Sequence, residues 1–198
     1  MNKTRLITLA IALLTTTGST VALAADRDSR EPNWTIKLGA YMPSSSSLRS
    51  DLGNTWYALD IDSGSRAAAG SQTVVYEYAD TVFASKTVDD AEGDSASLSL
   101  SSGGVGFAIR TNLANSEEHS IVPYAGAGLG LYQNYATLLV NVPGESASGA
   151  NSSTNLGYKL DAGIAFSNRV VLEADYSDAG PLGDVRLNGF SLLAGVKF

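Results

Sequence analysis

The sequence predicts an all-β protein, an eight-stranded antiparallel up-and-down transmembrane β-barrel that follows a cleavable signal peptide. The 198 residues are 44% hydrophobic and only 17% charged, and they include 20 glycines, which weaken helix interiors. Several segments alternate apolar and polar residues over eight or more positions, whereas none keeps a helical period for three turns. The less apolar faces of these segments gather glycines and charges of both signs, as the narrow polar interior of a small barrel requires.

Residues 1–24 are expected to be a secretory signal peptide, and residues 25–198 the barrel domain. Lys3 and Arg5 precede the apolar residues 6–14, and a small-residue cleavage motif follows at residues 22–24. Nine strongly apolar residues are too few for a helical membrane span, which needs about 20. We therefore expect an exported chain.

The first four expected strands are residues 33–41, 55–62, 71–85 and 97–110. The first two have clear apolar faces, formed by Trp34, Ile36, Leu38 and Ala40 and by Tyr57, Leu59 and Ile61. The third is ambiguous around two adjacent valines, and we expect Glu77 on its inner face. In the fourth, Leu98 and Leu100 are out of phase with Phe107, so the pair Gly103 and Gly104 predicts a β-bulge.

The last four expected strands, residues 121–135, 156–166, 168–178 and 188–198, alternate without interruption. Their apolar sets are Ala125, Ala127, Leu129 and Leu131; Leu156, Tyr158, Leu160, Ala162, Ile164 and Phe166; Val170, Leu172, Ala174 and Tyr176; and Phe190, Leu192, Ala194, Val196 and Phe198. Sequential hairpins are the simplest topology, with a tight turn at residues 167–168. The other expected connections are residues 42–52, 63–70, 86–95, 112–120, 136–153 and 178–185.

A barrel in lipid fits these faces better than a soluble β-sandwich does. A sandwich would leave its charged residues in solvent, whereas a barrel turns its apolar face outward and encloses the polar one. The inner faces would then carry Asp60 and Asp62 together with a structural charge network. We expect that network to comprise Lys37, Arg110, Lys159, Asp161, Glu173, Asp175 and Lys197.

Two segments, VPYAGAGLGLY at residues 122–132 and GFSLLAGVKF at residues 189–198, resemble the small outer-membrane β-barrel proteins of Gram-negative-type bacteria. That group includes the OmpA-, OmpX- and OmpW-like barrels. The resemblance implies an outer-membrane location, contact with outer-membrane lipids and lipopolysaccharide, and a terminal Phe198 that the assembly machinery reads. It also implies that both termini lie in the periplasm, so that residues 42–52, 86–95, 136–153 and 178–185 face outside.

Motifs that could carry chemistry are weak. The glycines at residues 126–130 lack the spacing and following helix of a nucleotide fingerprint, and the acidic residues 88–95 lack the spacing of a calcium-binding EF-hand. His119 and Ser120 are adjacent, whereas barrel lipid A deacylases place one residue between the two. Glu173 and Asp175 lie about 7 Å apart along one strand face, but no sugar could reach them inside a narrow barrel. We expect no catalytic, cofactor or metal site.

The expected function is that of a non-enzymatic outer-membrane barrel that stabilises the envelope or presents surface loops. A second hypothesis is an OmpW-like barrel that binds or passes small hydrophobic molecules, because Trp56, Val171 and Leu193 lie on inner faces. A lipid-modifying enzyme has the least support. The net charge of −7 argues against a nucleic-acid partner, and the absence of cysteine excludes thiolate chemistry.

Overall fold

The computed structural model describes residues 34–67, 72–90, 94–114, 120–166 and 169–198, without the side chains of residues 64–67. They belong to one compact unit, Pro32–Phe198. The expected signal peptide lies outside the described residues. Within the described part of the chain, no helix has the length and hydropathy needed to cross a membrane.

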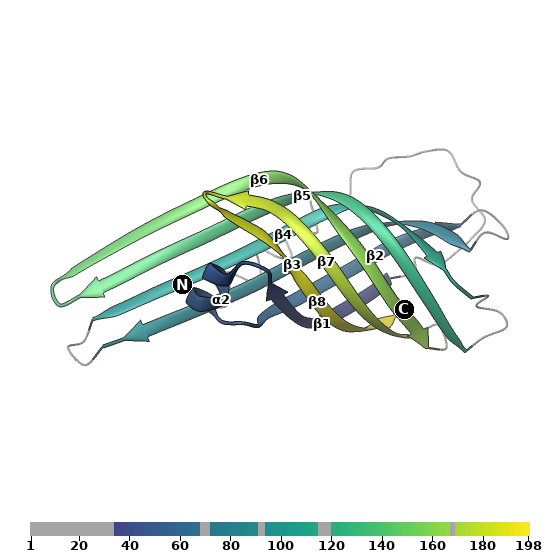
Figure 1. Cartoon of the computed structure of the whole chain (residues 1–198), viewed down its shortest axis with the longest axis horizontal. Coiled ribbons are helices and arrows are strands. Elements are labelled where there is room, and N and C mark those ends of the chain that lie inside the picture. The colour runs from purple at the N-terminus through teal and green to yellow at the C-terminus, as the bar shows by residue number, and fades with distance from the viewer. Residues whose placement is uncertain (1–33, 68–71, 91–93, 115–119, 167–168) are drawn as a thin grey trace. The chain divides into compact units, whose positions relative to one another are not determined.

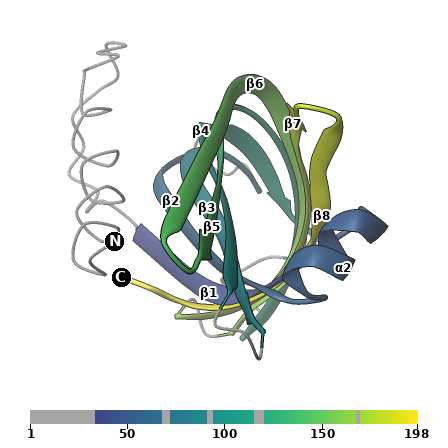
Figure 2. The same ribbon diagram turned by 90° about the vertical axis from the view of Figure 1, so that its left-hand side faces the viewer.

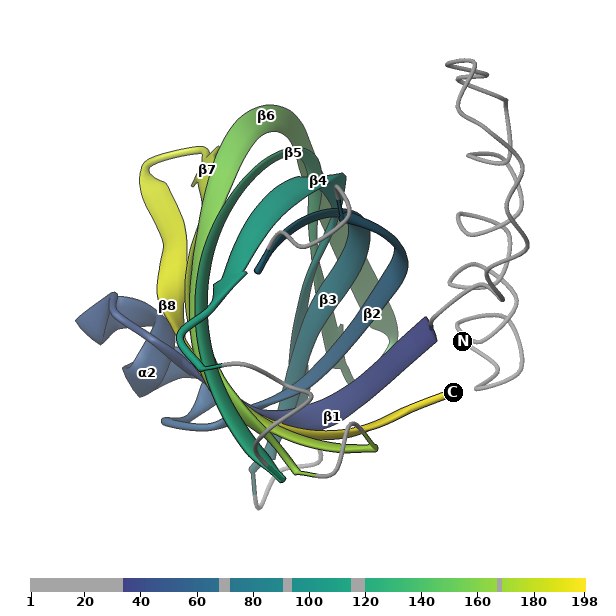
Figure 3. The same ribbon diagram turned by 90° about the vertical axis from the view of Figure 1, so that its right-hand side faces the viewer.

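Eight antiparallel strands form a closed barrel, which confirms the predicted fold. Each strand pairs with its neighbour in the sequence, and β1 also pairs with β8 and closes the ring, as Figures 2 and 3 show from the two ends. The strands are β1 (Trp34–Pro43), β2 (Trp56–Ala67), β3 (Thr73–Asp89), β4 (Ser95–Asn112), β5 (Ile121–Val142), β6 (Glu145–Phe166), β7 (Val170–Leu182) and β8 (Val185–Lys197).

Side chains alternate between an exposed apolar outer face and a buried, largely polar inner face. On β1, Leu38 is 62% exposed and the adjacent Lys37 is fully buried; on β7, Leu172 is 48% exposed and Glu173 only 4%. A soluble protein would have the opposite arrangement. The alternation follows from the strand period of two, which sends successive side chains to opposite faces.

The strands are unequal in length, and several are longer than predicted. β5 and β6 have 22 residues each, and β3 and β4 have 17 and 18, whereas β1 has 10. The β5–β6 and β3–β4 hairpins therefore project at one end in Figure 1. The prediction of a long connection at residues 136–153 was wrong. These residues form a β-ladder from the pair Ala136 and Asn151 to a turn at Gly144, whose φ is +90°. Its β5 half has adjacent apolar residues and its β6 half is small and polar, so neither half shows the apolar alternation that would reveal a strand.

The barrel has two distinct ends. We call the end with the β5–β6 turn the hairpin end, and the end with Trp34, Phe166, Val170 and Lys197 the terminal end. Only at the hairpin end does the described chain form a helix, α2 (Ser46–Leu52), which contacts β1, β3 and β4.

Helix α2 lies within the connection expected at residues 42–52, and the sequence analysis missed it. The side chain of Ser45 caps its first turn by accepting a hydrogen bond from the backbone of Leu48. Arg49 donates two hydrogen bonds of 2.7 Å to the carbonyls of Pro43 and Ser44, and Leu48 and Leu52 are buried. The spacing of four residues between these leucines is the sequence signal that would have found the helix.

The predicted bulge at Gly103 and Gly104 was wrong. β4 keeps a continuous register with both neighbours from Ser95 to Thr111. Leu100 belongs to a buried cluster that includes Leu52 of α2, and Leu98 packs against it. The apolar phase changes along β4 because the surroundings change: Phe107 is exposed outward, whereas Leu100 packs inward beneath the helix.

The inner-face assignment of Glu77 was also wrong. Glu77 is exposed, and its neighbours Tyr76 and Tyr78 point inward and are each 3% exposed. The two adjacent valines, Val74 and Val75, made the alternation of β3 ambiguous. A tyrosine can fill a barrel interior when its hydroxyl finds a partner there.

Candidate functional site

Among the described side chains, three cations and five carboxylates form a central layer of ion pairs in the barrel interior. Lys37, Arg110 and Lys159 come from β1, β4 and β6, whereas the carboxylates come from β2, β6 and β7. The carboxylates are Asp60, Asp62, Asp161, Glu173 and Asp175. Strand register places the groups at one level, since Lys37 is paired across the ladder with Asp60 and Asp161 with Asp175.

Lys37 has three carboxylate partners. Its ammonium nitrogen lies 2.5 Å from Oε1 of Glu173, 2.9 Å from Oδ2 of Asp62 and 3.2 Å from Oδ2 of Asp60. Charge-assisted hydrogen bonds of this kind are roughly twice as strong as neutral ones. The fully buried lysine is therefore compensated by groups from two other strands.

Lys159 shares two of these carboxylates, Asp60 and Glu173, with Lys37. It is hydrogen-bonded to Asp60 and lies 3.3 Å from Oδ2 of Asp175 and 3.7 Å from Oε1 of Glu173. Asp60 and Glu173 thus bridge the two lysines, so that β1, β2, β6 and β7 are joined through one set of ion pairs.

Arg110 spans the other half of the interior. Its guanidinium lies 3.0 Å from Asp161, 3.2 Å from Asp62 and 2.7 Å from Glu173, and it is stacked between the rings of Tyr76 and Tyr124, 4.4 and 4.3 Å from their centroids. The planar fork of arginine suits both interactions.

The contact between Arg110 and Asp161 depends on a glycine on the strand between them. In the ladder, Gly126 lies between Arg110 on β4 and Asp161 on β6. A Cβ atom at Gly126 would approach Oδ1 of Asp161 to 2.6 Å. The repeated glycines of β5 therefore provide space for large neighbouring side chains. Gly130 does the same for Tyr78, whose hydroxyl oxygen would lie 2.5 Å from a Cβ atom there.

Tyrosine hydroxyls complete the network. Tyr124 donates a 2.7 Å hydrogen bond to Glu173, and Tyr76 donates to Asp161. Towards the hairpin end, Tyr132 donates to Asp80 and lies 3.3 Å from the Tyr78 hydroxyl. The space beside this layer is a cavity of about 20 Å³, which has room for about one water molecule. The interior is therefore filled on this side of the ion pairs.

The carboxylates Asp60, Glu173 and Asp175 have the spacing of a metal site, because one oxygen from each lies within 4.8 Å of the others. Lys37 and Lys159 already bind these three residues through their ammonium groups. One further oxygen on each of Asp60, Asp62 and Asp175 has no hydrogen-bond partner among the described residues. A metal ion would have to displace the lysines, so the arrangement suits an internal ion-pair network better.

The structure brings together six of the seven residues expected in the charge network: Lys37, Arg110, Lys159, Asp161, Glu173 and Asp175. Lys197 lies at the terminal end, and none of the ion pairs in the described part of the chain includes it. The expected network did not include the tyrosines, although the glycines that face them on neighbouring strands indicate room for large side chains.

In the remaining motifs, the residues that the structure describes form no catalytic or metal-binding cluster. His119 lies outside the described residues, and Ser120 is exposed. The acidic segment 88–95 is described except for residues 91–93; residues 88–90 are exposed, and Asp94 and Ser95 are half-buried. Gly126, Gly128 and Gly130 lie within β5, a strand of the barrel wall.

Comparison with known proteins identifies the fold. No family model matches the sequence, and no curated protein does. The structure is similar to that of Ail, the attachment invasion locus protein of Yersinia pestis, in complex with the heparin analogue sucrose octasulfate, with a TM-score of 0.53 and 17% identity over 85% of this chain and 100% of that one. It is also similar to neisserial surface protein A, with a TM-score of 0.53 and 18% identity over 84% of this chain and 95% of that one.

Proposed function

We propose that this protein is an integral outer-membrane barrel without catalytic activity, which presents an extension of its β-sheet outside the cell. The observation that carries the proposal is the contrast between a filled interior and overlong hairpins. A membrane-spanning strand needs about 9–11 residues, so about half of each 22-residue strand remains beyond the bilayer.

The outer surface supports the membrane placement. Its exposed apolar side chains would contact the lipids, including lipopolysaccharide in the outer leaflet. Tyr158, Tyr176 and Phe190 form an aromatic cluster on β6, β7 and β8, with ring centroids 6.1 and 5.0 Å apart, of the kind that lies at membrane interfaces. Trp34 of β1 and Lys197 of β8 both lie at the terminal end, which we place in the periplasm.

The extension has an open strand edge. β6 pairs with β5 along its whole length, but its pairing with β7 begins only at Tyr158. Side chains of Ser153 and Asn155 bond to the carbonyl of Pro181, whereas residues 145–152 are exposed on both faces. An exposed edge of this kind can pair with a strand of another protein. We therefore place a protein-contact surface at the β5–β6 hairpin.

A sulfated sugar ligand, like the heparin analogue sucrose octasulfate in the Ail structure, has no support here. The described charged residues near the hairpin end are mainly acidic. They are Asp51, Asp89, Asp90, Asp94, Glu145 and Asp184, against Arg49, Lys86 and Arg186. A polyanion would be repelled by this excess of negative charge.

Passage of small hydrophobic molecules also has less support than surface presentation. Trp56 and Leu193 line the cavity of about 20 Å³, whereas Val171 lines a separate cavity at the terminal end. The ion pairs lie at the level between these cavities, so the three residues do not form one apolar path.

The orientation can be tested with single cysteines, because the natural chain has none. Ser148→Cys at the hairpin end should react with a membrane-impermeant maleimide on intact cells, whereas Ser120→Cys at the terminal end should react only after lysis. The reverse pattern would refute the orientation.

The contact surface can be tested by shortening the hairpin. Replacing residues 137–150 with Asn-Gly keeps the ladder pair of Ala136 and Asn151 next to a two-residue turn. The shortened barrel should insert normally, and cells that express it should lose any aggregation or adhesion that the full chain confers. If the full chain confers neither, or if the shortened chain confers both equally, the contact role is wrong.

A further inference from the structure

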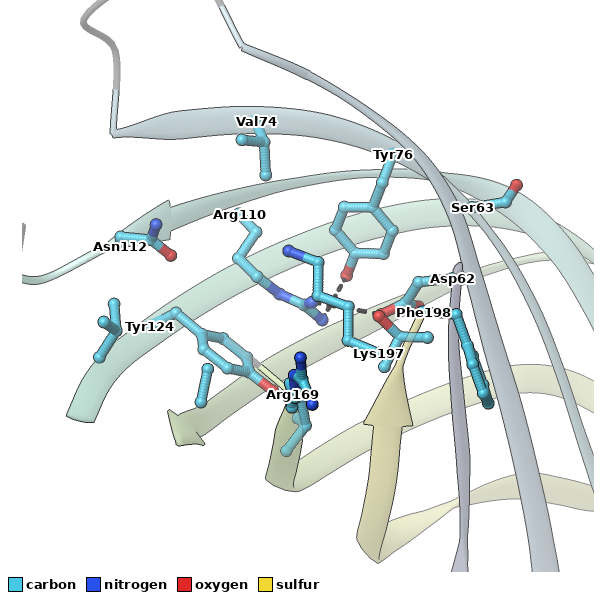
Figure 4. A pocket seen from close by; sticks show the side chains of 14 residues that line it. Asp62, Ser63, Val74, Tyr76, Arg110, Asn112, Tyr124, Arg169, Lys197 and Phe198 are labelled. Carbon is cyan, nitrogen blue, oxygen red and sulfur yellow. Dashed lines mark hydrogen bonds and ion pairs between the residues drawn. The ribbon is translucent and has the colours of Figure 1, made fainter. Parts of the chain in front are cut away.

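A cavity of about 470 Å³ opens at the terminal end of the barrel (Figure 4). The cavity lies on the terminal-end side of the ion-pair network, and Arg110 forms part of its wall. Figure 4 shows the side chains of Arg169 and Lys197 around the same cavity, near the rings of Tyr76 and Tyr124. We call this cavity the terminal mouth.

The backbone fixes the two outer cations side by side. The amide of Lys197, the last residue of β8, donates a 2.7 Å hydrogen bond to the carbonyl of Arg169, next to the start of β7. Arg169 in turn donates a 3.0 Å hydrogen bond to Phe166. The two positive side chains are therefore anchored to the closed ladder rather than to a long loop.

The charge of the terminal mouth is unbalanced. Among the described side chains that line it are three cations, Arg110, Arg169 and Lys197, and one carboxylate, Asp62. Asp62 is already bound by Lys37 and Arg110, and Arg110 has three carboxylate partners. Neither Arg169 nor Lys197 forms an ion pair within the described part of the chain. Among the described residues, two cations without an ion-pair partner thus meet, in a chain whose net charge is −7.

The surroundings of these cations suit a molecule rather than a bare ion. Thr35, Ser63 and Asn112 add hydroxyl and amide groups to the wall, and two tyrosines add ring surface. The volume equals that of about 15 molecules of liquid water. Arginine binds oxyanions through two parallel hydrogen bonds, and lysine adds a compact charge.

We propose that the terminal mouth binds a small soluble oxyanion with two or more negative charges on phosphate or carboxylate groups, held by Arg169 and Lys197. Its periplasmic source depends on the orientation proposed above, whereas the binding itself does not. The single-cysteine experiment tests the orientation alone, so the two ideas can fail separately.

The test uses the chain refolded in an uncharged detergent, titrated calorimetrically with inorganic phosphate and with citrate at constant ionic strength. At least one of these should bind at a saturable single site. Lys197→Gln and Arg169→Gln should each weaken binding at least tenfold, and the double variant should abolish it. Lys86→Gln removes the same charge at the hairpin end and should change affinity less than twofold. Unchanged heat-dependent electrophoretic mobility establishes that each variant is folded.

Several results would overturn the proposal. One is the absence of saturable binding of phosphate or citrate to the natural chain. Another is a loss of affinity in Lys86→Gln as large as that in Lys197→Gln, which would mean that only overall charge matters. Glu117 and Glu118 lie outside the described residues; binding seen only after both are changed to Gln would mean that the cations serve the chain's own carboxylates. Binding of phosphatidylglycerol in mixed micelles, with no binding of phosphate or citrate, would replace the soluble ligand with a lipid headgroup.

Discussion

At the scale of single residues, Glu173 is the hub of the interior. Its two carboxylate oxygens contact Lys37, Arg110 and Lys159, and Tyr124 donates a hydrogen bond to it. At 4% exposure, the group has little water to replace a lost partner. Removal of one member of a buried ionic group costs far more than the pair contributes, because the remaining charges are uncompensated.

We predict that Glu173→Gln lowers the free energy of unfolding by about 3–5 kcal/mol, because three buried cations share this carboxylate. The measurement is urea unfolding in micelles. Glu145→Gln, the same change at an exposed turn, should alter stability by less than about 0.5 kcal/mol. Equal effects of the two changes would show that water reaches the network.

Phe198 stays a predicted assembly signal. It is 71% exposed, and its backbone amide donates a 2.8 Å hydrogen bond to the carbonyl of Trp34. Phe198→Asp should reduce the amount of protein inserted in cells, whereas Phe198→Tyr should not, because the aromatic ring is retained. Insertion is measured by fractionating membranes and comparing unboiled with boiled samples. Normal insertion of the Asp variant would contradict the assignment.

At the scale of elements, the sequence predicted what depends on a period of two. The outer apolar sets of β1, β2 and β5 to β8 follow from alternation, and so do the inner positions of Lys37 and Glu173. Near the hairpin end the pattern fails for a physical reason. Beyond the bilayer, neither face of a strand is required to be apolar, so the ladder of β5 and β6 beyond Ala136 has no regular alternation of apolar and polar residues: Leu138 and Leu139 are adjacent on β5, and residues 145–152 of β6 are small or polar.

The errors within the site have a related cause. Alternation placed the charged residues on inner faces. The stacking of Arg110 on Tyr76 and Tyr124, however, depends on strand register, which alternation alone does not fix. Lys197 lies on the inner face, as predicted, but at the end of β8, nearer the terminal end than the layer of carboxylates is.

Leu172 provides a test of the outer face. Leu172→Arg should destabilise the barrel in bilayers by about 2–4 kcal/mol if the residue lies near the midplane. Location is tested separately with proteins that contain a single tryptophan: Leu172→Trp in a background with Trp34→Phe and Trp56→Phe, and a control that retains only Trp56, which is 2% exposed. Brominated acyl chains should quench the first protein strongly and the control weakly. Equal quenching would refute the inside-out assignment.

At the scale of the whole molecule, closure and filling have separate consequences. Closure pairs the backbone of every described strand with two neighbours over the barrel wall, so no edge meets the hydrocarbon. The ion pairs and tyrosine rings fill the barrel interior where an open channel would otherwise run.

We predict that unboiled protein migrates differently from boiled protein in mild SDS, because a closed ladder resists the detergent until it is heated. In planar bilayers the same preparation should give no steady open-channel conductance. Glu145→Gln, changed outside the barrel wall, should behave like the natural chain in both assays. A stable conductance in every insertion would contradict the filled interior, and identical migration would contradict closure.

The order of the strands also shapes how the barrel forms. Seven of the eight pairings between the described strands join neighbours in the sequence, and only the β1–β8 pairing, from Thr35 with Lys197 to Pro43 with Gly189, joins distant parts of the chain. Loop-closure entropy grows with the length of chain enclosed, so this seam has the largest entropic cost to form. Hairpins can therefore accumulate locally, and the seam should set the folding rate. Changes along β1 or β8 should slow folding more than equally destabilising changes in β4.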